Sequence, residues 1–118
     1  MAMKATFPKA ARVRSKHDFE RARKVARAVS DGVLRISILP NGSGLTRLGL
    51  AVAKRGSAIE RNRIKRVIRE VFRLRRAALP AGFDLVVSPK DYAAASGFEA
   101  VSKSFDGLIA RIWPGDRR

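Results

Sequence analysis

The sequence of 118 residues contains no cysteine, which excludes a disulfide framework and a thiolate metal site. Its apolar stretches have the length of strands, far below the roughly 20 residues that a membrane-spanning helix needs. The first nine residues hold no apolar segment of signal-peptide length. These absences lead us to expect a cytoplasmic protein.

The side chains that usually carry catalysis are also scarce. The single histidine, His17, is expected in the first turn of a helix, with no nucleophile or second histidine to accompany it. The 10 acidic residues are scattered, so none of them suggests a two-metal nuclease site. There is no glycine-rich phosphate loop. We therefore expect no catalytic residue and no metal site in the protein itself.

Positive charge is abundant by comparison. The chain has 26 Lys and Arg residues against 10 Asp and Glu residues, a formal net charge of +16. Residues 1–76 hold 21 of the basic and 5 of the acidic residues, so the whole excess lies there. A generally basic surface is one explanation, but the asymmetry favours a polyanion-binding surface. Arg outnumbers Lys by 18 to 8, which favours nucleic acid over a membrane surface.

The pattern of apolar residues predicts one domain over residues 1–118, with a loose basic arm over residues 1–12. The 46% of hydrophobic residues is enough for one core. Helices are predicted from Ser15 to about Ala28, from Ser57 to about Ala78 and from Ser96 to Trp113. Strands are predicted at Val33–Leu39, Leu45–Ala53 and Phe83–Ser88. The order α-β-β-α-β-α indicates an α+β protein, a two-layer α/β sandwich with helices on a small mixed sheet, whose first strands could divide into three.

Local signals refine this outline. Asp31-Gly32 predicts a turn, and residues 40–44 predict a flexible hairpin loop between the first two strands. The run Leu85-Val86-Val87 is apolar on both faces, which indicates a central, covered strand. Capping boxes begin at Ser57 and at Ser96. One face of the second strand carries only small residues, namely Gly49, Ala51 and Ala53. This face either lies under the first helix or leaves a groove open beside it.

The helix from Ser57 to Ala78 carries most of the functional signal. At 100° per residue its apolar stripe is Ile64, Val67, Ile68, Val71 and Leu74. The opposite face carries Asn62, Lys65, Arg66, Arg69, Arg73 and Arg76. A solvated charged face is the alternative, but such faces usually interleave charges of both signs. Only Glu60 and Glu70 offset this row, so we infer that it faces an external anion.

Two stretches resemble the signature of the protein subunit of bacterial ribonuclease P. The first is Leu48–Arg55, a strand that ends in two basic residues. The second is Glu60–Glu70, a helix that opens with Arg61-Asn62-Arg63. The resemblance extends more weakly from about Arg12 to Trp113. At this spacing, the strand and the basic helix together are highly specific.

The resemblance implies a ribonucleoprotein whose catalyst is RNA. The protein would bind the RNA subunit and the 5′ leader of precursor tRNA, and the holoenzyme would hydrolyse one phosphodiester bond to release the leader. Magnesium would act at the RNA active site. The resemblance further implies an α/β sandwich with a left-handed β-α-β crossover, whereas general stereochemistry predicts a right-handed one. The expected partners are the ribonuclease P RNA and precursor tRNA, with no membrane and no DNA.

The resemblance also assigns site residues. Those matching the RNA-subunit contact region are Lys54, Arg55, Arg61, Asn62, Arg63, Lys65, Arg66, Arg69 and Arg73. Those expected in the cleft for the leader are Phe19, Arg23, Arg35, Ser37, Ala51 and Lys90. Phe19 matches a cleft aromatic on which a base could stack, and core packing is its alternative role.

The chain departs from the family pattern mainly in the cleft. Many members carry a second aromatic residue one helical turn after the first, where this chain has Arg23. The first strand has no aromatic residue either, and its outward face carries Arg35 and Ser37. Phosphate contact or arginine stacking would then replace base stacking. Lys90 stands where many members show a basic cluster.

Two other functions compete with this one. The chain could be a stand-alone RNA-binding protein of ribosomal or chaperone-like kind, or it could place its basic helix in the major groove of DNA. A helix that reads the groove usually mixes Asn, Gln, Ser and Arg at the reading positions. The exposed stripe here is nearly all Arg and Lys, which suits phosphate binding better.

Overall fold

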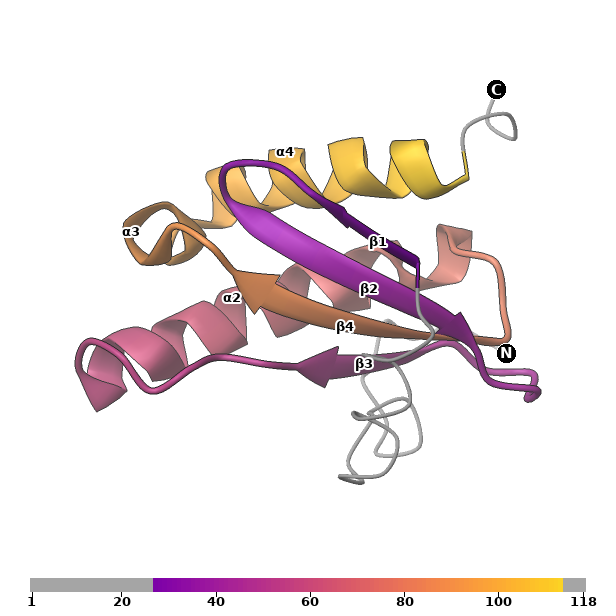
Figure 1. Ribbon diagram of the computed structural model, residues 1–118, viewed down its shortest axis with the longest axis horizontal. Helices are drawn as coiled ribbons and strands as arrows, with labels where there is room; N and C mark the ends of the chain where they lie inside the picture. Colours follow the sequence, from indigo (N-terminus) through magenta and orange to yellow (C-terminus); the bar gives the residue numbers. More distant parts are fainter. Residues whose placement is uncertain (1–26, 114–118) are drawn as a thin grey trace.

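The computed structural model describes residues 27–113 and contains a small sheet with helices packed on it (Figure 1). The strands are β1 (Arg27–Ser30), β2 (Leu34–Pro40), β3 (Arg47–Leu50) and β4 (Phe83–Pro89). The helices are α2 (Ala58–Arg75), a 3-10 turn η2 (Arg76–Ala78), α3 (Tyr92–Ala95) and α4 (Phe98–Ile112). The basic arm and most of the first predicted helix lie outside the described residues. Mixed α+β structure, with the first strands divided into three, is confirmed.

The start of the described chain corrects one boundary. Arg27 and Ala28 were predicted as the end of a helix, but they belong to β1 and pair with Ile38 and Ser37 of β2. The hairpin satisfies their backbone groups by pairing with β2 and places Val29 against the core. Tertiary pairing therefore overrides the helical spacing of the apolar residues here. The predicted turn at Asp31-Gly32 is confirmed as the connection of this hairpin.

The sheet has the order β1-β2-β4-β3. β1 and β2 are antiparallel, β2 and β4 are antiparallel, and β3 and β4 are parallel, so the sheet is mixed, as predicted. The predicted hairpin between β2 and β3 is wrong, because β4 lies between them. The central place of β4 is confirmed: Leu85, Val86 and Val87 are all buried. A strand apolar on both faces gains most burial at the centre of a sheet.

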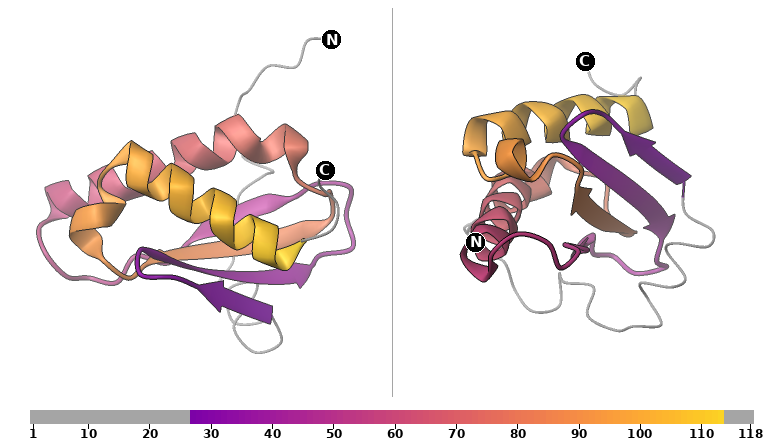
Figure 2. Two further views of the ribbon diagram at one scale, coloured as in Figure 1. Left: turned by 90° about the horizontal axis from the view of Figure 1, so that it is seen from above. Right: turned by 60° about the vertical axis from the view of Figure 1, so that its left-hand side comes forward.

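The helices lie together behind the sheet in Figure 1, and the view from above in Figure 2 shows the same layering. β3 and β4 both run to the left in Figure 1, with β4 above β3, and α2 connects them behind the sheet. A chain that rises from β3 to β4 through a helix on that side makes a left-handed crossover. The handedness implied by the family resemblance is therefore confirmed, against the usual right-handed rule.

The core lies between the sheet and these helices. It includes Leu34, Ile36 and Ile38 from β2, with Ile64, Ile68, Val71 and Phe72 from α2 and Val101, Phe105, Leu108 and Ile112 from α4. Most of the predicted stripe on α2 is confirmed, but one residue is wrong: Leu74 is 48% exposed. Phe72, which the stripe left out, is fully buried in its place. No helix within residues 27–113 is long and apolar enough to cross a lipid bilayer.

The two predicted capping boxes differ in outcome. Ser57 is the N-cap of α2, and its side chain accepts a hydrogen bond from the Glu60 backbone N–H at 3.0 Å. Ser96 does not cap α4, because Gly97 holds that position and the Ser96 hydroxyl donates to the Ala93 carbonyl at 2.8 Å. Ser96 instead ends α3, a short helix that the sequence analysis missed.

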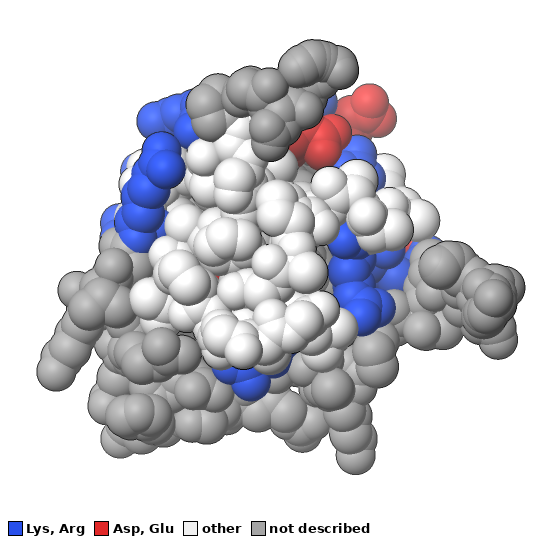
Figure 3. All heavy atoms as spheres, turned by 90° about the vertical axis from the view of Figure 1, so that its right-hand side faces the viewer, with Lys and Arg blue, Asp and Glu red and all other residues white. Residues whose placement is uncertain are grey.

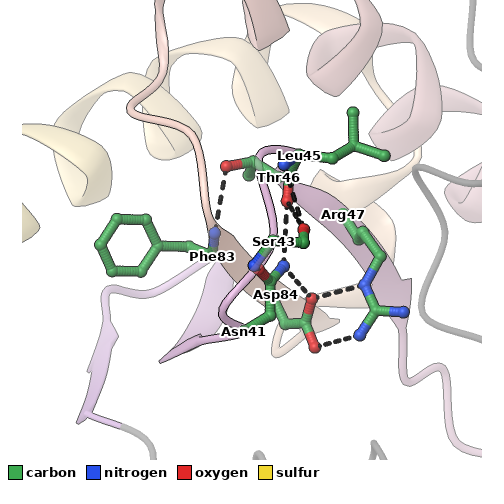
Figure 4. Close-up of polar contacts among 7 residues, drawn as sticks. All are labelled: Asn41, Ser43, Leu45, Thr46, Arg47, Phe83 and Asp84. Carbon is green, nitrogen blue, oxygen red and sulfur yellow. Dashed lines mark hydrogen bonds and ion pairs between the residues drawn. The ribbon is translucent and has the colours of Figure 1, made fainter.

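The loop after β2 is anchored by a buried carboxylate (Figure 4). Asp84 on β4 is fully buried and accepts two hydrogen bonds from the Arg47 guanidinium, both at 2.7 Å. The Asn41 side-chain amide donates to Asp84 at 2.8 Å and to the Leu45 carbonyl at 3.0 Å. This network fixes the long connection between β2 and β3, which is therefore ordered by side chains rather than by a hairpin turn.

Asp31 ties the first hairpin to α4. Its carboxylate accepts hydrogen bonds from the backbone N–H groups of Val33 and Leu34 and from the hydroxyl of Ser104 at 2.7 Å. Burial alone would raise the pKa of Asp31, but these hydrogen bonds and the charge of Arg111 together lower it below its usual value.

Asp31→Asn should therefore destabilise the protein in a pH-dependent way. The pKa of the Asp31 carboxyl is lower in the folded state than in the unfolded state. The ionised carboxylate therefore stabilises the fold at pH values above its unfolded pKa of about 3.9, and this stabilisation is lost as the pH falls through the folded pKa. At pH 7 we expect the free energy of unfolding of the variant to be about 1–2 kcal/mol lower than that of wild type. Urea unfolding should show this gap closing below about pH 4. Asp106→Asn, which removes an exposed partner of Arg75, is the control, and an equal loss there would contradict the prediction.

Candidate RNA-binding surface

The crossover helix α2 presents a row of cations away from the core. Its 18 residues span about 27 Å at a rise of 1.5 Å per residue. Burial of Ile64, Ile68, Val71 and Phe72 fixes which side packs inward. Asn62, Arg63 and Arg66 are exposed, whereas Lys65, Arg69 and Arg73 are half-buried. The fold therefore turns the predicted basic face outward.

Charge compensation is uneven along this face. Arg73 pairs with Glu70 one turn earlier, and hydrogen bonding from Arg73 lowers the pKa of the Glu70 carboxyl. Arg75 pairs with Asp106 of α4 at 2.6 Å. Within residues 27–113, no carboxylate pairs with Arg63 or Arg66. The uncompensated charge is thus concentrated in the first half of α2, whereas Arg73 already has an internal partner.

A shallow hollow runs along the middle of this face. It is lined by Asn62, Arg66, Arg69, Glu70 and Arg73. Four of these five residues belong to the predicted contact set, so the helix brings them together in one place. An open hollow lined by guanidinium groups suits the phosphates of a nucleic-acid backbone.

Arg61 has a structural contact that the sequence did not indicate. Its guanidinium donates to the Gly56 carbonyl at 2.9 Å and to the Arg55 carbonyl at 3.3 Å. These two carbonyls belong to the loop that enters α2. Gly56 adopts φ +69°, a left-handed conformation that glycine allows without strain. Arg61 therefore holds the loop that carries Lys54 and Arg55, in addition to any contact with RNA.

The residues predicted for the leader cleft fall into three groups. Arg35 and Ser37 share the sheet face opposite the helices, because they alternate with the core residues Leu34, Ile36 and Ile38. Ala51 follows β3 on the same face and donates its backbone N–H to the Val87 carbonyl. Arg35 and Ala51 are exposed, whereas Ser37 is only 7% exposed.

The other two groups of predicted cleft residues are Lys90 alone and Phe19 with Arg23. Lys90 lies just past β4 and lines a hollow with Arg55 and Tyr92, so it joins the basic pair before α2 rather than the centre of the sheet. Phe19 and Arg23 lie outside the described residues. The predicted first helix beside the small face of β3 likewise lies mostly outside the described residues.

Sequence analysis missed Tyr92 as a residue of this region. Tyr92 begins α3, its hydroxyl donates to the Ala53 carbonyl, and the Arg55 guanidinium lies over its ring. The signal was present in the sequence, since Asp91 before Tyr92-Ala93-Ala94-Ala95 is a helix N-cap pattern. The tyrosine itself carries no periodic pattern that would assign it to a site.

Charge does not cover every side of the molecule. Figure 3 shows the end that carries η2 and the connection after β2, and uncharged residues occupy the centre of the described surface there. Lys and Arg lie toward the margins of this view. This end of the molecule is therefore not part of a uniform basic coat.

A small mixed four-stranded sheet with a cationic helix exposed along its left-handed crossover is the arrangement of a nucleic-acid-binding protein. Comparison with known proteins identifies the family within that class. The family model described as Ribonuclease P matches residues 7–113. The chain belongs to this family of ribonuclease P protein components, which are parts of a tRNA-processing ribonuclease.

Individual relatives agree with this assignment. The ribonuclease P protein component of Desulforapulum autotrophicum is 31% identical over 112 residues, covering 94% of this chain and 96% of the relative. That of Clostridioides difficile is 36% identical, covering 80% of this chain and 84% of the relative. The solved RNase P protein from Thermotoga maritima superposes with a TM-score of 0.75 at 30% identity, covering 85% of this chain and 96% of the other.

Proposed function

We propose that the protein binds the catalytic RNA subunit of ribonuclease P through α2 and the 5′ leader of precursor tRNA along the sheet face opposite the helices, where Arg35 and Ala51 are exposed. The ribonucleoprotein then removes the leader to give the mature 5′ end. The observation that carries this proposal is the uncompensated cationic half of α2, displayed on the crossover helix of a ribonuclease P family fold.

The grip on the RNA subunit is electrostatic. Each phosphate that a cation neutralises releases condensed counterions, so binding depends steeply on salt. Arg63 and Arg66 supply charge that no described carboxylate offsets. The first turn of α2 adds backbone N–H groups and the positive end of the helix dipole, beside Lys54 and Arg55.

Catalysis is assigned to the RNA, with magnesium at the RNA active site. Within residues 27–113, no three His, Cys, Asp or Glu side chains are grouped so that they could hold a metal ion. The cationic groups on α2 are guanidinium and ammonium groups, which bind phosphate rather than magnesium. The protein would thus assist magnesium indirectly, by organising the phosphates that ligate it.

The leader is proposed to cross the sheet face that carries Arg35 and Ala51. Arg35 is exposed and pairs across the sheet with Ser88 of β4, so its guanidinium projects from a rigid strand. Phe19 and Arg23 are assigned to the same cleft by family resemblance. This chain would hold the leader mainly through phosphate contact or arginine stacking, because β2, the first strand predicted from the sequence, lacks an aromatic residue.

Arg35→Ala should weaken binding of the holoenzyme to precursor tRNA by about threefold to tenfold, the loss expected for one phosphate contact at moderate salt. Mature tRNA, which lacks the leader, should bind the variant and wild type equally. Affinity measurements with both tRNAs check this. Lys103→Ala, which removes an exposed cation from α4, is the matched control. Equal losses for precursor and mature tRNA would place Arg35 outside the leader path.

The function as a whole is tested by reconstitution with a bacterial ribonuclease P RNA at low magnesium. Leader removal from precursor tRNA should be strongly stimulated by the protein. If the protein binds RNA but gives no stimulation, the stand-alone RNA-binding function is favoured instead. Preference for duplex DNA over ribonuclease P RNA would favour the DNA-binding alternative.

A further inference from the structure

Tyr92 makes two contacts with the segment that connects β3 to α2. Its hydroxyl donates to the Ala53 carbonyl at 3.1 Å. Its ring lies under the guanidinium of Arg55, whose central carbon is 4.7 Å from the ring centroid. Both contacts come from α3, which follows β4 directly and lies almost 40 residues after the β3–α2 segment in the chain. Tyr92 therefore joins two segments that are distant in the sequence.

The support beneath Tyr92 is rigid. Asp91 caps α3 by accepting the Ala94 backbone N–H at 3.1 Å, and Ala95 is fully buried. Just before the helix, the backbone N–H of Lys90 donates to the Val33 carbonyl at 2.8 Å. A side chain placed on such a base can hold a partner in one orientation.

The segment with the basic pair is held from two sides. On one side, Arg61 of α2 donates to the carbonyls of Arg55 and Gly56. On the other side, Tyr92 donates to the Ala53 carbonyl, which also accepts the Arg55 backbone N–H at 2.9 Å. Among the described residues, the Arg55 side chain has no hydrogen bond or ion pair, and its guanidinium interacts with the Tyr92 ring.

Stacking through one face leaves the edge of a guanidinium available. The N–H groups of Arg55 lie in the plane of the group and can still donate to a phosphate while the face rests on Tyr92. Arg55, Lys90 and Tyr92 line the same hollow, together with Glu60 and Asp91. The two carboxylates in this hollow repel an anion. A phosphate is therefore attracted there only if the side chains of both Arg55 and Lys90 are held toward it.

We propose that Tyr92 is a positioning residue for RNA binding, which holds Arg55 beside Lys90 so that both meet one RNA phosphate. Tyr92 contacts no reacting atom and acts through Arg55. The proposal rests on the proposed function and names a specific phosphate subsite within it, at the junction of β4, α3 and the loop before α2.

The test is a double-mutant cycle on affinity for ribonuclease P RNA over a series of salt concentrations. Tyr92→Leu should weaken binding about threefold to fivefold, the scale of an exposed cation–π contact. Its log–log salt slope should fall toward that of Arg55→Ala, by up to about 0.7–0.9 for one lost phosphate contact. In the Arg55→Ala background, Tyr92→Leu should cause no further loss. Tyr92→Phe, which keeps the ring but removes the hydroxyl that donates to Ala53, should lose less affinity than Tyr92→Leu.

Two further variants keep the result unambiguous. Phe98→Leu removes another partly exposed aromatic ring and should bind like wild type. Arg55→Lys keeps the charge but loses the planar stack, and should weaken binding as Tyr92→Leu does, even if the latter folds poorly. Independent losses from Arg55→Ala and Tyr92→Leu, or an unchanged salt slope in Tyr92→Leu, would overturn the positioning role. Failure of the wild-type protein to bind the RNA would instead overturn the proposed function.

Discussion

Arg63→Ala combined with Arg66→Ala weakens binding to ribonuclease P RNA by about 10-fold to 50-fold at about 0.1 M salt, on the prediction that each arginine neutralises one phosphate. Both side chains are exposed on the first half of α2, and neither has a described ionic partner. Their loss leaves the fold intact, because neither contributes to the core. The log–log slope of affinity against salt should fall by roughly 1.4–1.8.

The pairing of charges along α2 supplies a sharp internal comparison. Arg73→Ala should cost less RNA affinity than Arg66→Ala, because Arg73 is already engaged by Glu70. Arg61→Ala should cost affinity and also loosen the entry loop, since Arg61 holds two loop carbonyls. Lys103→Ala on α4 is the control for nonspecific charge. A uniform loss across all four cations would mean that net charge, and not this surface, governs binding.

Phe72→Ala is expected to lower the free energy of unfolding by about 3–5 kcal/mol, the cost of deleting a fully buried aromatic side chain. Phe72 is completely buried and belongs to the hydrophobic core cluster. A loss of this size is a large part of the about 5–15 kcal/mol by which a typical domain is stable, so the variant should unfold at a markedly lower temperature than wild type. Urea unfolding followed by circular dichroism measures it.

Leu74→Ala is the matched control, two residues along the same helix. Leu74 is 48% exposed, so its truncation should cost under about 1 kcal/mol. Phe72→Leu, which keeps most of the apolar volume, should fall between the two. Equal destabilisation by Phe72→Ala and Leu74→Ala would show that α2 is rotated about its axis relative to the arrangement described here.

Phe72 and Leu74 also show why helical periodicity alone selected the wrong residue for the core. At 100° per residue, Phe72 and Leu74 lie about 80° to either side of Ile64, at opposite edges of one apolar arc. The sequence of α2 alone cannot select between the edges, because both are apolar. Tertiary packing makes the selection, because the Phe72 edge is the one buried in the core cluster.

The basic surface was largely predictable for the opposite reason. An amphipathic helix must bury its apolar stripe, so its cations are exposed in any fold that contains it. The Ser57 cap, the span of α2 and the outward row from Asn62 to Arg69 followed from residues near one another in the chain. Contacts between distant segments were not predictable in this way, and Tyr92 over Arg55 and Asp84 beneath Arg47 are examples.

The sequence by itself determined that this protein carries a basic helix for a polyanion, that β4 is covered on both faces, and, through its signature, the family. These properties depend on composition and on local periodicity. Only the tertiary structure decided that β4 lies between β2 and β3, that Arg27 and Ala28 form a strand, and that Arg61, Arg73 and Tyr92 have partners within the protein. Such choices depend on which distant surfaces meet, and the free energy of packing them is not contained in any single segment.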